Sequence, residues 1–252
     1  MNVLERALVE KAGREHGWEN VVESVEARIV LASARHRGHA TITVADDNGS
    51  GWLIAFPEGR LTRELDRSFP GFVQGVGRFN VSDIDTLAAL LRRAAELAQS
   101  LPDEAARTFR KRTAAMLATV AMQGTEVERI VRQRVSQDVF REALLDYWGN
   151  ACAVTGLTLP DVLRASHAKS WADCTSDEER LDVFNGFLLT AHLDALFDRG
   201  LITFDTSGNL VASSRLSAAH CARLHLDGGM CLRWLAPEHI PYLQWHREHQ
   251  FE

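Results

Sequence analysis

Two aspartates stand out in the stretch 185–200, which reads NGFLLTAHLDALFDRG. Its apolar residues recur at spacings typical of a helix with one buried face, so we expect one helix here. Asp194 and Asp198 are four residues apart, which in a helix stacks both carboxylates on one side. Two stacked carboxylates repel each other unless a cation lies near them, and such oxygen ligands favour Mg²⁺, Ca²⁺ or Mn²⁺. The alternative is a pair of solvated carboxylates on an exposed helix face.

The elements around this stretch can position a second reactive group. The sequence predicts short strands at 152–156 and 163–167, a hairpin from 201–204 and 210–213, a short helix, a strand near 231–235 and a last helix from Pro237. The strand 163–167 ends in His167, and the stretch with the two aspartates follows it after a loop. Strands, a terminal histidine and a helix with carboxylates are together typical of a ββα arrangement around a metal.

Residues 134–251 resemble the HNH endonuclease family, in its branch of bacterial restriction-type proteins. The resemblance rests on the strings RVSQDVFREALLDYW, CAVTGL, LRASHAKSWADC, ERLDVFNGFLL, HLDALFDRGLITF and YLQWHRE, which occur in this order. It implies a ββα-metal fold and a metal-dependent endonuclease that acts on DNA. Hydrolysis of a phosphodiester needs an activated water and neutralised charge at the phosphate, and one histidine with one divalent cation can supply both.

The resemblance also implies roles for single residues. His167 matches the general base, and Asn185 matches the central asparagine, which holds the metal loop and the base in position. Asp194 matches the helix ligand of the metal, and Asp198 lies where some members carry a second helix ligand. His192 lies where some members carry an acidic residue that binds or supports the metal. Mg²⁺ is the expected ion, with Mn²⁺ as the alternative.

Three positions depart from the pattern of the family. Ser166, a weak neutral ligand, stands where many members carry Asp or His, and Ala168 and Ser170 stand where many carry Ile and Pro. These departures favour a second hypothesis, in which a catalytically weakened HNH fold binds DNA or protein within a defence complex without cutting.

The charge of the chain is unevenly distributed. The net charge is −6, but residues 105–134 carry seven cations against two acids, a local balance of +5. A basic segment ahead of an acidic one predicts a phosphate-binding face, although two solvated helix faces would give the same pattern. The candidate DNA contacts are Arg110, Lys111, Arg112, Arg134, Gln137, Arg141 and Lys169. Of these, three (134, 137 and 141) recur at helical spacing on one face, which suits phosphate contacts or a salt-bridged helix surface.

The N-terminal half predicts a small domain without recognisable chemistry. Its expected elements are a helix at 2–16, strands at 26–35 and 39–45, a turn at 48–51, strands at 52–56 and 78–81, and a helix capped at 82–83 that runs to Ser100. Helices at 103–123 and 125–148 follow. We therefore expect an α+β protein with three parts: a domain at 1–101 for target recognition, docking or regulation, a basic helical connector at 102–124, and an HNH nuclease domain at 125–252.

The composition of the 252-residue chain limits where in the cell it is expected to act. No apolar run approaches the roughly 20 residues that span a bilayer, and the charged N-terminus does not read as a signal peptide. A cytoplasmic protein without a membrane partner is expected. None of the four cysteines forms a CxxC pair, which argues against a four-cysteine zinc site. The resemblance points to restriction of foreign DNA or phage defence, with other proteins of such a system as candidate partners.

Overall fold

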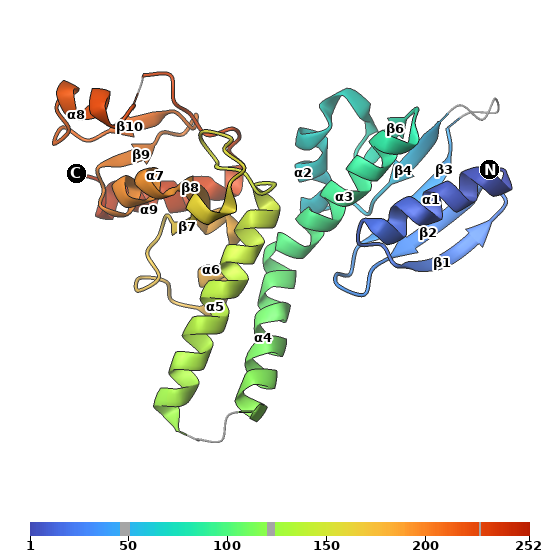
Figure 1. Cartoon of the computed structure of the whole chain (residues 1–252), viewed down its shortest axis with the longest axis horizontal. Helices are drawn as coiled ribbons and strands as arrows, with labels where there is room; N and C mark the ends of the chain where they lie inside the picture. Colours follow the sequence, from blue (N-terminus) through green and yellow to red (C-terminus); the bar gives the residue numbers. More distant parts are fainter. Residues whose placement is uncertain (46–50, 120–123, 227) are drawn as a thin grey trace. The chain divides into compact units, whose positions relative to one another are not determined.

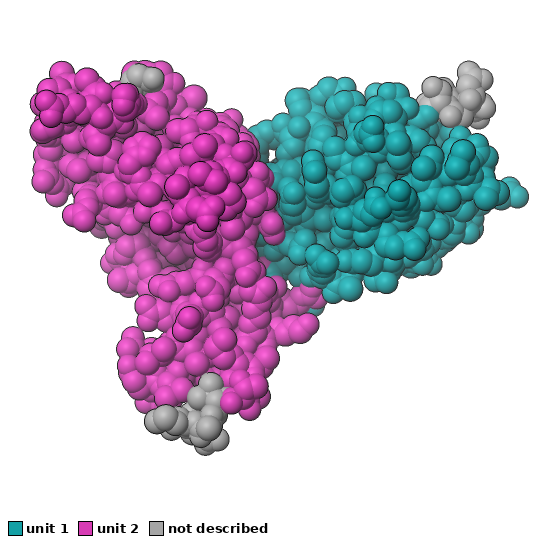
Figure 2. Space-filling view, in the orientation of Figure 1, with its two compact units in different colours: residues 1–104 teal, residues 105–252 magenta. Residues whose placement is uncertain are grey.

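The computed structural model describes residues 1–45, 51–119, 124–226 and 228–252. Helices and strands are mixed along the chain, so the predicted α+β class is confirmed. The chain divides into two compact units, Met1–Glu104 and Ala105–Glu252, which Figure 2 shows in different colours. The three-part organisation expected from the sequence stays a prediction.

Unit 1 is built on one antiparallel sheet, whose described strands follow the order β1-β2-β3-β4-β6-β5. The strands are β1 (Asn20–Val25), β2 (Arg28–Ala32), β3 (His39–Val44), β4 (Trp52–Ala55), β5 (Val73–Gly75) and β6 (Arg78–Val81). The helices are α1 (Val3–Glu15), α2 (Arg60–Ser68), the short 3-10 helix η1 (Pro70–Phe72) and α3 (Ile84–Ser100). Alternate residues of β2 to β4 are buried, and α1 and α3 lie over the sheet (Figure 1). The core of this unit therefore lies between one sheet face and these helices.

Unit 2 begins within α4 (Pro102–Thr119) and contains the second long helix, α5 (Thr125–Tyr147), which runs antiparallel to α4 (Figure 1). Its strands are β7 (Leu163–His167), β8 (Gly186–Thr190), β9 (Ile202–Phe204) and β10 (Leu210–Ala212). Its shorter helices are η2 (Pro160–Val162), α6 (Asp177–Arg180), η3 (Val183–Asn185), α7 (Ala191–Asp198), α8 (Ala218–Arg223), η4 (Pro237–His239) and α9 (Ile240–His249). Strand β7 pairs with β8, β9 pairs with β10, and the buried face of α5 packs on β7, β8 and η3.

Two predicted strands of unit 2 are wrong. Residues 152–156 form a turn, in which the Gly156 N–H donates to the Cys152 carbonyl at 3.0 Å. Residues 231–235 form one isolated bridge, between Cys231 and Asn209. The Leu232 and Arg233 N–H groups donate to the carbonyls of two separate segments, at Gly208 and Ala153, so no ladder with one partner strand can form.

In unit 1, β1, α2 and β5 were not predicted. Strand β1 is exposed along most of its length and shows no clear apolar alternation, whereas α2 is a short, mostly polar helix with only two apolar residues, Leu61 and Leu65. Residues 48–50 of the predicted turn and 120–123 of the predicted helix lie outside the described residues. Within the described residues, no helix is long and apolar enough to cross a membrane.

Candidate active site

The stretch 185–200 is a strand followed by a helix, so the single helix expected from its apolar spacing is wrong. Residues Gly186–Thr190 form β8, all five of which are buried, and α7 begins only at Ala191. A strand that packs on both faces is continuously apolar, and such a run cannot be told from a buried helix by its period. The two aspartates still lie on α7 with helical spacing.

Strands β7 and β8 form the antiparallel pair on which the site is built. Their register sets Ser166 opposite Phe187 and His167 opposite Gly186. Neighbouring residues of a strand point to opposite faces. Ser166 accordingly contacts α7, whereas His167 contacts α5 and the loop 168–182. Strand β7 therefore carries Ser166, which faces α7, and His167, which faces α5 and the loop, as consecutive residues.

His167 is held by three groups. Its ring stacks on Phe140 of α5, with ring centroids 3.8 Å apart, and meets the edge of Trp171 at 5.9 Å. Its Nε2 lies 3.0 Å from the carbonyl oxygen of Arg180. A carbonyl can only accept, so Nε2 carries the proton and Nδ1 keeps a free lone pair. Burial, together with the charge of Arg180, lowers the pKa of His167 to about 4, so the ring is neutral at neutral pH.

Gly186 leaves the space that this stack needs. A Cβ at Gly186 would lie 2.5 Å from Cζ of Phe140 and 2.9 Å from the Ser166 carbonyl oxygen. We expect Gly186→Ala to lower the free energy of unfolding by about 1–3 kcal/mol through overpacking, and to shift the Phe140 ring that supports His167. Chemical denaturation measures the first effect. Gly228→Ala, where a Cβ meets nothing within 4 Å, is the matched control and should be near neutral. Equal stability of both variants would contradict the close packing.

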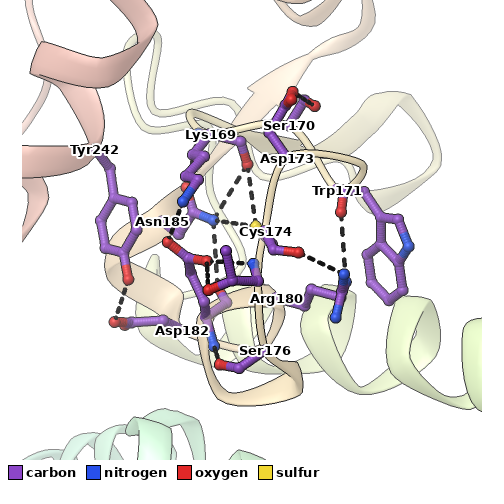
Figure 3. Close-up of polar contacts among 12 residues, drawn as sticks. Lys169, Ser170, Trp171, Asp173, Cys174, Ser176, Arg180, Asp182, Asn185 and Tyr242 are labelled. Atoms are coloured by element: carbon purple, nitrogen blue, oxygen red, sulfur yellow. Dashed lines mark hydrogen bonds and ion pairs between the residues drawn. The ribbon is translucent and has the colours of Figure 1, made fainter.

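Asn185 is fully buried and fastens the loop 168–182 that follows His167 (Figure 3). Its Oδ1 accepts from the Lys169 N–H at 2.7 Å. Its Nδ2 donates to the carbonyls of Lys169 and Glu179, both at 3.2 Å, and lies 3.3 Å from the Cys174 Sγ. With no exposed atom, the amide binds the loop rather than a substrate. Asn185 is thus a positioning residue, because the loop carries the Arg180 carbonyl that orients His167.

The carboxylates of Asp194 and Asp198 meet at the Ser166 hydroxyl. Ser166 is buried and donates to Asp198 Oδ1 at 3.2 Å, and the same hydroxyl acts on Asp194 by opposing the rise in the pKa of that carboxyl group. Burial raises the pKa of Asp194, and burial with the charge of Asp194 raises the pKa of Asp198. Two acids that disfavour each other's ionisation form a site that a cation would stabilise. Their oxygen donors fit a hard divalent ion such as Mg²⁺ or Mn²⁺.

His192 is exposed, and its Nδ1 lies 3.2 Å from the Thr190 hydroxyl. Among the described residues, no three His, Cys, Asp or Glu side chains converge closely enough to hold a metal. His192 therefore does not complete a set of three ligands with Asp194 and Asp198 in this arrangement. The two aspartates with the neutral Ser166 are what this part of the fold offers a metal ion.

The predicted DNA contacts differ in what their side chains do. Arg141 donates to the carbonyls of Leu163 and Pro160, so it ties α5 to the start of β7. Lys169 forms a mostly buried ion pair with Glu179 at 2.6 Å. Arg112 pairs with Glu142 at 2.7 Å, and Arg110 lies 3.9 Å from Glu178. Of the predicted contacts on α4 and α5, residues 110–112, 134 and 137 have exposed side chains.

Sequence reasoning missed three residues that hold the base. Phe140, Trp171 and Arg180 surround the His167 ring, although all lie within the strings that carry the family resemblance. The signal for Phe140 was its place on the apolar face of α5. The Arg180 contact is made by a backbone carbonyl, which no side-chain pattern can indicate.

His246 fixes α7 from its other end. It is fully buried on α9, stacks on Phe197 at 3.9 Å and has its Nε2 3.0 Å from the Phe197 carbonyl oxygen. Its Nδ1 lies 3.0 Å from the Thr203 hydroxyl, and burial lowers its pKa to about 4. The ring is therefore a structural contact among α9, α7 and β9.

We expect the free energy of unfolding to fall as the pH drops from about 6.5 towards about 4, because the unfolded chain binds a proton at His246 that the folded chain excludes. The loss is on the order of 2–4 kcal/mol for this group and is absent above the unfolded pKa. Urea denaturation across this pH range measures it. His246→Gln should flatten the slope, whereas His249→Gln, at an exposed histidine of the same helix, should not. Identical slopes in the two variants would show that His246 does not contribute.

Two antiparallel strands, a helix with paired carboxylates and a histidine at a strand end together form a ββα arrangement. A family model described as HNH endonuclease matches residues 152–205, a segment that contains β7, β8 and α7. The resemblance inferred from the sequence is thus confirmed over this segment, which supports nuclease activity. HNH nucleases act on DNA and generally use divalent metals. Comparison with curated proteins gives no match to the chain.

Proposed function

We propose that the chain is a DNA endonuclease of the HNH type, which hydrolyses phosphodiester bonds with Mg²⁺ or Mn²⁺. One observation carries the proposal: the segment that matches the family holds a neutral imidazole at the end of β7 and an acidic pair on α7, which Ser166 of β7 binds. Phosphodiester hydrolysis requires these two functions in one site, since one must activate water and the other must neutralise charge.

In the proposed reaction, Nδ1 of His167 accepts a proton from the water that attacks the phosphorus. The Arg180 carbonyl holds Nε2–H and stabilises the imidazolium that results. Bound substrate assists, because the negative phosphodiester raises the proton affinity of a nearby imidazole. A divalent ion held by Asp194 and Asp198 would supply charge neutralisation at the phosphate and at the leaving oxygen. Asn185 keeps the loop, and with it the base, in place.

Relaxation of supercoiled plasmid tests the proposal directly. The full chain should nick or linearise the plasmid with Mg²⁺ or Mn²⁺ and should be inactive in a chelator. A His192→Ala variant is the matched control for histidine variants, since His192 is exposed on α7. No cleavage with either ion at any protein concentration that binds DNA would refute the enzymatic proposal.

The second candidate function is a module that binds DNA or protein without cutting. It is favoured by the low proton affinity of His167 and by the neutral Ser166, which leaves two carboxylates for a metal. The same plasmid assay decides between the two, when it is combined with a gel-shift measurement of DNA binding. Binding without metal-dependent cleavage would support the module.

We further propose that the nuclease acts in restriction of foreign DNA or phage defence, and that residues 1–101 supply target choice, partner docking or restraint. The support is the restriction-type resemblance of residues 134–251. Cells that express the chain should lower the plating efficiency of infecting phage relative to cells that express His167→Ala. Equal plating efficiencies across a panel of phages would contradict this setting.

A further inference from the structure

A polar pocket of about 320 Å³ lies beside the His167 loop in unit 2. It is lined by Arg129, Arg132, Gln133, Trp171, Asp177 and Arg180, so one wall comes from α5 and the other from the loop 168–182 and α6. Its volume falls within the range of sites that bind small ligands or single groups of larger ones. Two of these residues, Trp171 and Arg180, also contact the His167 ring, and the other four have no part in the proposed reaction.

Trp171 and Arg180 form an aromatic and cationic wall. The Arg180 guanidinium lies 5.4 Å from the centre of the Trp171 ring, and Figure 3 shows both side chains beside α5. Arg180 also donates to the carbonyls of Trp171 and Cys174, which fixes the loop backbone. The Trp171 side chain is half-buried, so its indole is both positioned and accessible. A flat indole beside a guanidinium is a surface on which any base can stack.

The opposite wall, from α5, carries two guanidinium groups, those of Arg129 and Arg132. The carboxylate of the lining, Asp177, belongs to α6 and lies 3.5 Å from Arg132 and 3.4 Å from Arg180. Arg129 pairs with Glu126, but both side chains are about two-thirds exposed. Exposed pairs of this kind contribute little and exchange readily for a phosphate. Within the described residues, the Gln133 amide has no hydrogen-bond partner and remains available to a ligand.

We propose that this pocket receives one nucleotide of the DNA strand next to the scissile phosphate, with its base stacked on Trp171 and its phosphate at Arg129 and Arg132. The inference rests on the proposed function. Trp171 meets the His167 ring edge-on, so a base on Trp171 belongs to a nucleotide close to the phosphate that His167 serves. Stacking tolerates any base, so the pocket fixes the position of the strand rather than its sequence.

Tryptophan fluorescence tests the stack without cleavage. The full chain in chelator is titrated with short DNA duplexes of mixed sequence and with the matching single strands, while anisotropy of labelled DNA reports binding. DNA should quench emission in the wild type, and Trp171→Phe should lose this quench while it retains most of the affinity. Trp171→Ala should bind about 5- to 150-fold more weakly, the equivalent of the usual contribution of base stacking. Melting curves show whether each variant is folded.

The phosphate contact is tested by Arg129→Ala, because the Arg129 guanidinium pairs with the exposed Glu126 of its own helix. It should reduce the slope of log affinity against log salt by about one unit. Arg215→Ala is the matched control, because Arg215 is also an exposed arginine paired with a glutamate, Glu252. Its salt slope should equal that of the wild type.

The pocket proposal would be overturned by equal quenching in the wild type and Trp171→Phe, or by the same salt slope in Arg129→Ala and Arg215→Ala. Either result together with metal-dependent plasmid nicking would reject the pocket alone and leave the nuclease standing. If no form of the chain bound DNA in the anisotropy measurement, the proposed function itself would be rejected, and the pocket with it.

Discussion

Replacing His167 with alanine is expected to lower the rate of DNA cleavage by a factor of about 10² to 10⁴, the usual contribution of general acid–base catalysis. The loss follows because Nδ1 is the free acceptor of a ring whose other nitrogen is committed to the Arg180 carbonyl. Plasmid nicking under single-turnover conditions at saturating metal measures the chemical step. DNA affinity in chelator should change little, since the neutral ring adds no charge to the binding face.

A control variant and a chemical rescue test whether the loss of activity is due to the missing imidazole of His167. His192→Ala should cleave at a rate near that of the wild type, because His192 is exposed and its ring lies within hydrogen-bond distance of the Thr190 hydroxyl rather than of either aspartate. Added imidazole should restore part of the activity of His167→Ala if the missing group is a proton acceptor. Wild-type rates in His167→Ala would refute its assignment as the base.

Asp194→Asn is expected to raise the metal concentration needed for cleavage by far more than it disturbs folding. The substitution keeps the shape of the side chain and its capacity to accept from Ser166, but it removes a charge from the acidic pair. Burial already raises the pKa of Asp194, so loss of this charge should leave the metal-free protein as stable as before or more stable. Stability and activity should therefore change in opposite directions.

The measurement is the nicking rate against Mg²⁺ and Mn²⁺ concentration for the wild type, Asp194→Asn and Asp198→Asn, with a melting curve for each at every metal concentration. Metal that binds the folded state raises the Tm of the wild type, and this rise should shrink in Asp194→Asn. Mn²⁺ should rescue cleavage better than Mg²⁺, since it accepts mixed donor sets more readily. If Asp194→Asn were fully active and Asp198→Asn were inactive, the principal metal ligand would be Asp198, one helical turn later.

The placement of the candidate residues on a strand end and a helix was more predictable than the backbone between them. The sequence patterns predicted β7, the end of this strand at His167 and the spacing of Asp194 and Asp198, because each depends on neighbours in the chain. The pairing of β7 with β8 joins residues 19 to 27 positions apart and leaves no local period. The apolar run Phe187–Leu189 satisfies a helix template and a buried strand equally, and only the tertiary packing decides between them.

Side-chain partners were the least predictable part. Arg141 lies at helical spacing from exposed cations, yet its guanidinium donates hydrogen bonds to two backbone carbonyls. Lys169 is likewise engaged by Glu179 ten residues later. A charge pattern in the sequence indicates where the cationic side chains are. Which group each of them binds depends on the tertiary path of the loops. The loop 168–182 is positioned by Asn185, a contact that spacing alone could not reveal.

The acceptor that orients His167 belongs to the main chain. Every residue type at position 180 carries the same carbonyl, so a side-chain substitution there cannot directly switch the imidazole to its other tautomer. The protonation pattern of the base therefore depends on the path of the loop, and an exchange of Arg180 acts on it only through the loop carbonyls of Trp171 and Cys174 that its side chain binds. An insertion or deletion within 168–182 would move the carbonyl of residue 180 itself, which makes loop length a quantity to preserve when this chain is engineered.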